Sequence, residues 1–232
     1  MYTPSADRLT RPLPVMVWFY GGAFVLGDNW ELGFYDGTFT VSGHDVIIVA
    51  PNYRLGPFGF LVTESLRGNY GLEDQRFALE WVQRNIAQFG GDPNNVLIYG
   101  ESAGAMSVGA QLASPPARGL FHRAIMQSNA FGIRFKPRDF AIELGNGFAE
   151  AVGCGHDDVV CLRNATLETI AFKHGRIQPR SEYWLADLLT VCSIWQIVCF
   201  FADARAVGTD RRRRGPAHGV ARRLPRAKRV SL

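Results

Sequence analysis

The sequence has little with which to enter or cross a membrane. Residues 1–14 are polar, contain three prolines and lack the apolar stretch of a secretory signal. The longest apolar run covers residues 188–202, and its 15 residues are fewer than the about 20 that a spanning helix needs. Residues 183–202 would be long enough only if Asp187 were tolerated. We expect no signal peptide and no membrane anchor, and both a secreted and a cytoplasmic location stay open.

Most of the chain also lacks an excess of positive charge. The net charge of +4 comes from residues 202–232, which carry ten basic and two acidic side chains, whereas residues 1–201 have a net charge of −4. Charge alone would suit nucleic acid or an anionic lipid surface. Since no other feature points there, we expect no nucleic-acid partner. The abrupt change after about residue 175 is typical of a shifted reading frame, so residues 176–232 are predicted to lie outside the fold.

The sequence around Ser102 predicts a reactive serine. Four apolar residues, Val96–Tyr99, are typical of a buried strand, and Gly100-Glu101-Ser102-Ala103-Gly104 matches G-x-S-x-G before a helix of small residues. In a nucleophile elbow, such a turn holds the serine hydroxyl at the carboxyl edge of a parallel sheet. The alternative is a structural turn serine.

A second glycine turn follows a strand near the start of the chain. The apolar run Val15–Tyr20 predicts a central strand, and Gly21-Gly22-Ala23-Phe24 follows it. Small residues let backbone N–H groups point into a cleft, where they can stabilise an oxyanion. Taken alone, this segment is a tight turn; together with the Ser102 motif, it indicates an oxyanion hole.

The order of the remaining elements predicts a doubly wound sheet. Residues 45–50 form another apolar run, residues 52–61 a loop rich in glycine and proline, and residues 72–89 have helical spacing that ends at Gly90-Gly91-Asp92-Pro93. Residues 124–128 predict one more strand. Strands alternating with helices indicate an α/β fold with a mostly parallel sheet.

These motifs together resemble the type-B carboxylesterase/lipase family, the cholinesterase-like branch of the α/β-hydrolases. The resemblance runs in family order over about residues 10–175. It rests on five segments: 17–24, 52–61, 68–76, 89–104 and 120–128. It implies a 1–175 domain that is a partial α/β-hydrolase, truncated at both ends.

The resemblance implies a role for each matched residue. Ser102 matches the acylated serine, Gly22, Ala23 and Ala103 match the oxyanion-hole donors, and Glu101 matches an acidic residue that lines the site. Arg54 and Asp74 match a structural ion pair, and Cys154 and Cys161 match a disulfide. Full-length relatives need neither a metal nor an organic cofactor. The implied substrate is a small carboxylic ester; the oligomeric state stays open.

The catalytic acid and histidine of the family have no clear counterparts. In most members both lie well over a hundred residues after the serine, and only 130 residues follow Ser102 here. His218, in a small-residue loop, is the nearest echo of the family's histidine but comes too early. The leading hypothesis is a serine ester hydrolase acting through an acyl-enzyme. The alternative is a non-catalytic or inactive fragment that lacks the acid and histidine.

Overall fold

A computed structural model describes residues 1–174 and 228–229 of the chain. Its strands are β1 (Tyr2–Thr3), β2 (Leu13–Phe19), β3 (Ile47–Val49), β4 (Gly91–Glu101), β5 (Arg123–Gln127) and β6 (Lys228–Arg229). Its α-helices are α1 (Thr38–Gly43), α2 (Gly56–Phe60), α3 (Tyr70–Asn85), α4 (Ala103–Ala113), α5 (Arg138–Val152), α6 (Val159–Asn164) and α7 (Leu167–His174). Short 3₁₀ helices cover Ala6–Arg8, Glu31–Gly33, Ile86–Phe89 and Pro115–Ala117.

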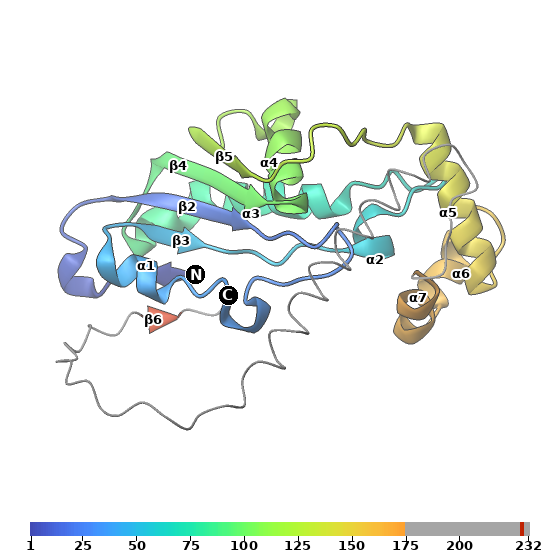
Figure 1. The fold of residues 1–232 in the computed structure, drawn as a ribbon, viewed down its shortest axis with the longest axis horizontal. Helices are drawn as coiled ribbons and strands as arrows, with labels where there is room; N and C mark the ends of the chain where they lie inside the picture. The colour runs from blue at the N-terminus through green and yellow to red at the C-terminus, as the bar shows by residue number, and fades with distance from the viewer. Residues whose placement is uncertain (175–227, 230–232) are drawn as a thin grey trace, which may run out of the picture. The chain divides into compact units, whose positions relative to one another are not determined.

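The strands form one mixed, mostly parallel sheet in the order β5-β4-β2-β3-β1-β6 (Figure 1). The pairs β2–β3, β2–β4 and β4–β5 are parallel, and β1 is antiparallel to β3 and β6. This is the predicted fold class. The parallel register opposes Phe19 to Gly100, so the carboxyl ends of β2 and β4 lie side by side. The segments that follow these two strands, the glycine turn and the Ser102 motif, therefore start at the same sheet edge.

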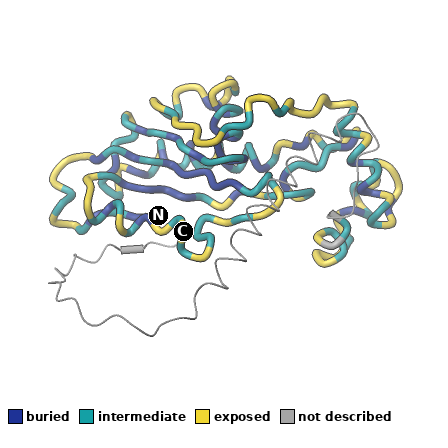
Figure 2. The backbone as a smooth tube through the Cα atoms, in the orientation of Figure 1, coloured by how far each residue is buried: buried dark blue, intermediate teal, exposed yellow. Residues whose placement is uncertain are grey.

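Side chains of β2 alternate between two apolar layers. Val15, Val17 and Phe19 are fully buried on the face that packs against α3 and α4, through residues such as Leu79 and Val108. The intervening side chains face the other way, where Trp18 contacts Tyr35 and Tyr99 at ring-centroid distances of 5.1 and 4.8 Å. Figure 2 shows the backbone of the central strands largely in dark blue, the colour of buried residues. Burial on both faces explains the uninterrupted apolar run of this strand.

A second, smaller apolar cluster is formed by α5, α6 and the segment that joins them. Phe148, Ala149, Cys154 and Leu162 are buried together, and Leu61 packs against them. A disulfide joins Cys154 to Cys161. At Gly145, α5 packs closely against the backbone of Val62. A Cβ on Gly145 would lie 1.8 Å from the carbonyl oxygen of Val62, so only glycine fits there.

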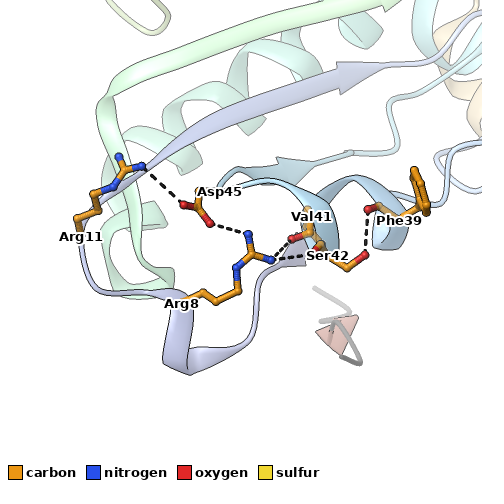
Figure 3. Close-up of polar contacts among 6 residues, drawn as sticks. All are labelled: Arg8, Arg11, Phe39, Val41, Ser42 and Asp45. Atoms are coloured by element: carbon orange, nitrogen blue, oxygen red, sulfur yellow. Dashed lines mark hydrogen bonds and ion pairs between the residues drawn. The ribbon is translucent and has the colours of Figure 1, made fainter. Parts of the chain in front are cut away.

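Arg8 fastens the N-terminal segment to the end of α1 (Figure 3). Its guanidinium donates to the carbonyl oxygens of Val41 and Ser42 at 3.1 and 2.7 Å and pairs with Asp45 at 2.6 Å. Arg11 lies 3.7 Å from the same carboxylate. The last carbonyl groups of a helix lack intrahelical partners, so a cation here both satisfies them and interacts favourably with the helix dipole.

The structure differs from the sequence prediction at several element ends. β4 begins at Gly91, five residues before the predicted start, and the helix predicted over residues 72–89 is α-helical only to Asn85, after which a 3₁₀ turn follows. The strand predicted over residues 45–50 is three residues long. The predicted loop 52–61 contains α2, with Pro57 in its first turn, where the missing N–H of proline costs no helical bond.

Lys228–Arg229, from the tail, pair with β1 at the sheet edge. The rest of residues 176–232 lie outside the described residues, so the boundary at 175 stays a prediction. Within the part that the structure describes, no helix is long and apolar enough to span a membrane.

The ion pair predicted between Arg54 and Asp74 is confirmed. Asp74 Oδ2 accepts from the backbone N–H and from Nε of Arg54 at 3.0 and 2.8 Å, and Oδ1 accepts from Nη2 at 2.8 Å. Burial alone would raise the pKa of Asp74, but the hydrogen bonds from Arg54 outweigh it and lower the pKa below its ordinary value.

We expect Asp74→Asn to lower the free energy of unfolding by about 1 kcal/mol at pH 7, because the bidentate pair is lost. Because the pKa of Asp74 is lower in the folded chain, its ionisation stabilises the fold fully when the pH is above the unfolded-state pKa of about 3.9. This stabilisation is lost as the pH falls through the folded-state pKa. Urea unfolding of wild type and Asp74→Asn at pH 7 and near pH 3 measures the difference between their free energies of unfolding. This difference should be smaller at the lower pH. Glu80→Gln, whose carboxylate lies 3.6 Å or more from its arginines, is the control with little expected effect. An unchanged difference at both pH values would contradict the account.

Candidate active site

Ser102 sits at a sharp turn between β4 and α4. Its backbone has φ 54° and ψ −120°, a conformation that favours glycine and is costly for serine. Its N–H donates to the carbonyl oxygen of Gln127 on β5 at 3.0 Å, and its carbonyl oxygen accepts from Met106 N–H at 2.9 Å. Both neighbouring elements thus hold the turn, and the Ser102 side chain is only partly buried.

The two glycines of the motif are required by space rather than by φ. A Cβ on Gly104 would lie 2.0 Å from the carbonyl oxygen of Phe19, and a Cβ on Gly100 would lie 2.5 Å from the carbonyl group of Gly104. Contacts this short do not occur for real Cβ atoms. The start of α4 therefore packs directly onto the backbone of β2, which brings the Ser102 turn beside the end of that strand.

The glycine turn after β2 touches the Ser102 turn. A Cβ on Gly21 would lie 2.9 Å from the carbonyl oxygen of Glu101, 3.0 Å from Glu101 Oε2 and 3.3 Å from Ser102 Cβ. The next three residues, Gly22, Ala23 and Phe24, have φ values of 106°, 53° and 64°. Gly21 thus leaves room for the Ser102 turn, a role that the sequence analysis did not predict.

The predicted oxyanion donors come from two sides of this contact. Gly22 and Ala23 lie in the turn after β2, and Ala103 is the first residue of α4, where helical N–H groups have no intrahelical acceptor. The N–H groups of these three residues make no hydrogen bond to another described residue.

Glu101 ends β4 immediately before Ser102 and is half-buried. Burial raises the pKa of its carboxyl group. Its position next to Gly21 and Ser102 places an acidic side chain at the Ser102 turn.

None of the described histidine side chains is hydrogen-bonded to Ser102. His122 Nδ1 accepts from the N–H of Val96 at 3.2 Å, in the middle of β4 and six residues before Ser102. His156 pairs with Glu150 in the region of α5. His44 follows α1. The His174 side chain and His218 lie outside the described residues.

The described residues also contain no group of three or more His, Cys, Asp or Glu side chains placed to hold a metal ion.

We expect Ser102→Gly to be more stable than Ser102→Ala by about 1 kcal/mol, because glycine relieves the positive φ while both variants lack the hydroxyl. Urea unfolding of the two variants measures the difference. A Ser102→Gly variant no more stable than Ser102→Ala would show that the turn is unstrained.

Comparisons with known proteins identify the family of the chain. The model of the carboxylesterase family matches residues 1–183. The chain is 45% identical over 170 residues to para-nitrobenzyl esterase of Bacillus subtilis, and the match covers 72% of this chain and 34% of that protein. It is 45% identical over 184 residues to human bile salt-activated lipase, with 72% and 24% covered. Cholinesterase 1 of Branchiostoma lanceolatum is 42% identical over 185 residues, with 75% and 52% covered.

Solved structures give the same result. A thermophilic PNB esterase superposes with a TM-score of 0.67 at 43% identity, covering 72% of this chain and 35% of that one. A second PNB esterase gives a TM-score of 0.68 at 42% identity, with 74% and 37% covered. The chain thus spans about a quarter to a half of the length of these relatives. The resemblance and the α/β-hydrolase fold inferred from the sequence are confirmed, and the chain belongs to the carboxylesterase family.

Proposed function

We propose that the chain is a serine ester hydrolase that acts through an acyl-enzyme on Ser102. The observation that carries the proposal is the strained backbone of Ser102 at the β4–α4 turn, in contact with Gly21. Strain of this kind persists only where the surrounding structure enforces it, and it is common at nucleophiles. The family gives the substrate class, a small-molecule carboxylic ester.

The proposed reaction has two steps. Ser102 Oγ attacks the carbonyl carbon of the ester while its proton passes to a base, the carbon–oxygen bond to the alcohol breaks, and the alcohol leaves with a proton. Water then attacks the acyl-enzyme and releases the carboxylic acid and free Ser102. N–H groups of Gly22, Ala23 and Ala103 would hold the oxyanion in both steps, each donor being worth about 3–4 kcal/mol in measured cases.

The first step of this reaction requires a base beside Ser102. A serine hydroxyl needs a base close by to act at neutral pH, and no described histidine is bonded to Ser102. This observation favours the second candidate function, an inactive carboxylesterase-like chain. The two candidates differ in whether Ser102 reacts when a base is supplied.

Hydrolysis of an activated aryl ester, with and without added imidazole, separates the two candidates. Imidazole in solution can accept the serine proton in place of a side chain. We expect imidazole to accelerate hydrolysis by the wild-type chain beyond the rate measured with Ser102→Ala under the same conditions. Circular dichroism of both proteins controls for folding. Equal rates for wild type and Ser102→Ala at every imidazole concentration would establish the inactive alternative.

A further inference from the structure

The turn after β2 needs support from outside itself. Ala23 and Phe24 have positive φ without being glycine, which costs on the order of 1 kcal/mol or more per residue. Inside the turn, Val25 and Leu26 donate to the carbonyl oxygen of Gly22 at 3.0 and 3.1 Å. These bonds close the turn but do not fix its direction relative to Ser102.

Two bonds from residues 53–56 provide that support. The Tyr53 hydroxyl donates to the carbonyl oxygen of Tyr20 at 2.6 Å, and the Gly56 N–H donates to the carbonyl oxygen of Phe24 at 2.7 Å. One bond lies before the turn and the other lies within it. The Tyr20 carbonyl belongs to the same peptide plane as the Gly21 N–H, so a bond to this oxygen sets the direction in which the turn begins.

Tyr53 is itself held firmly. Its ring stacks on that of Tyr20 with centroids 4.4 Å apart, and both side chains are almost fully buried. The Tyr20 hydroxyl returns the bond by donating to the carbonyl oxygen of Tyr53 at 3.1 Å. Burial and then the neighbouring phenols Tyr20 and Tyr35 raise the pKa of Tyr53, so its hydroxyl keeps the proton that it donates.

The Tyr20 carbonyl is also a contact point for the Ser102 turn. A Cβ on Gly104 would lie 2.8 Å from this oxygen, and one on Gly21 would lie 3.3 Å from Ser102 Cβ. The Tyr53 hydroxyl therefore meets the backbone of β2 where the start of α4 packs onto it. A shift of this peptide would move Gly22 and Ala23 relative to Ser102.

We propose that Tyr53 is a positioning residue for the oxyanion hole, acting through its hydrogen bond to the Tyr20 carbonyl oxygen. The inference rests on the proposed function for its catalytic meaning. Its structural content, that the Tyr53 hydroxyl orients the turn carrying Gly22 and Ala23, stands apart from whether Ser102 turns over a substrate.

Tyr53→Phe and Tyr20→Phe form a matched pair that tests the inference. Each removes one buried hydroxyl from the same ring stack, so their general effects on packing should be similar. Tyr53→Phe frees the carbonyl that leads into the turn, whereas Tyr20→Phe frees the backbone of Tyr53 on the far side of the stack.

The first measurement is amide NMR of the ¹⁵N-labelled chain. In Tyr53→Phe we expect shifted Gly22 and Ala23 resonances and hydrogen exchange at Val25 and Leu26 at least about tenfold faster, because their acceptor lies in the turn. In Tyr20→Phe these amides should match wild type. Equal effects in the two variants, or none in Tyr53→Phe, would overturn the inference.

The second measurement is the rate of Ser102 phosphonylation at saturating phosphonate. We expect Tyr53→Phe to slow it at least about tenfold with little change in phosphonate affinity, since misplaced donors act on the transition state, and Tyr20→Phe to leave it near wild type. If wild-type Ser102 does not react while the NMR differences hold, the proposed function fails and the positioning role stands. If wild type reacts and both variants react equally fast, the positioning role fails instead.

Discussion

Gly104→Ala is expected to destabilise the chain by more than about 3 kcal/mol, because a Cβ at this position has no room beside the backbone of β2. The new Cβ would lie 2.0 Å from the Phe19 carbonyl oxygen and 2.8 Å from that of Tyr20. Both atoms belong to backbone at the end of the central strand β2, which cannot move aside without breaking its pairing with β4. Overpacking against fixed backbone falls at the severe end of substitution effects.

The urea midpoint of unfolding measures this effect, and Gly109→Ala is its control. Gly109 lies in the same helix, but its Cβ would meet Met126 Sδ at 3.6 Å, an ordinary contact. Alanine there should be neutral or stabilise by about 0.5–1 kcal/mol through helix propensity. A Gly104→Ala chain as stable as Gly109→Ala would show that α4 does not pack on β2 as described.

Phe19→Ala is expected to cost about 3–5 kcal/mol, because a fully buried aromatic side chain is replaced by a cavity. Phe19 lies in the main apolar cluster with Ile98 and Val108, from the strand and helix on either side of Ser102. Its loss should also loosen the turn, since the Phe19 carbonyl is the surface on which Gly104 packs.

Phe77→Ala provides the comparison for this substitution. Phe77 lies on the outer side of α3, is 63% exposed and contacts Arg84 through its ring face. Removing the Phe77 ring should change the free energy of unfolding, measured by urea, by less than about 0.5 kcal/mol. If the two phenylalanine variants unfold at the same urea concentration, β2 is not the buried centre of the sheet.

Much of the fold could be predicted because local sequence carried the signal. The apolar run over residues 15–20 indicated a strand buried on both faces, and α3 and α4 cover one of them. Errors arose where local signals conflicted with long-range pairing. Gly91-Asp92-Pro93 favours a turn, yet Gly91 pairs with Leu13 through a register shift and joins β4. Pro57 favoured a loop, although proline is tolerated in the first helical turn.

In the candidate site too, features with a local sequence signal could be predicted and those formed by long-range contacts could not. The Ser102 turn and the glycine turn could be found from the sequence, because close backbone approach leaves room for no residue larger than glycine at Gly21, Gly100 and Gly104. Tyr53 was recognised only as part of a matched segment. Its bond to the Tyr20 carbonyl joins residues 33 positions apart and has no local signature. The base could not be found either, since a catalytic histidine is brought to its serine by the fold and not by spacing.

The central claim is that the chain presents Ser102 as a nucleophile within a carboxylesterase-family core. Mass spectrometry after incubation with an organophosphonate, with peptide mapping of the adduct, tests this claim most directly. We predict one adduct per chain, located on Ser102, formed faster when imidazole is added and absent from Ser102→Ala. A folded wild-type chain that carries no adduct on Ser102, with or without imidazole, would contradict the claim.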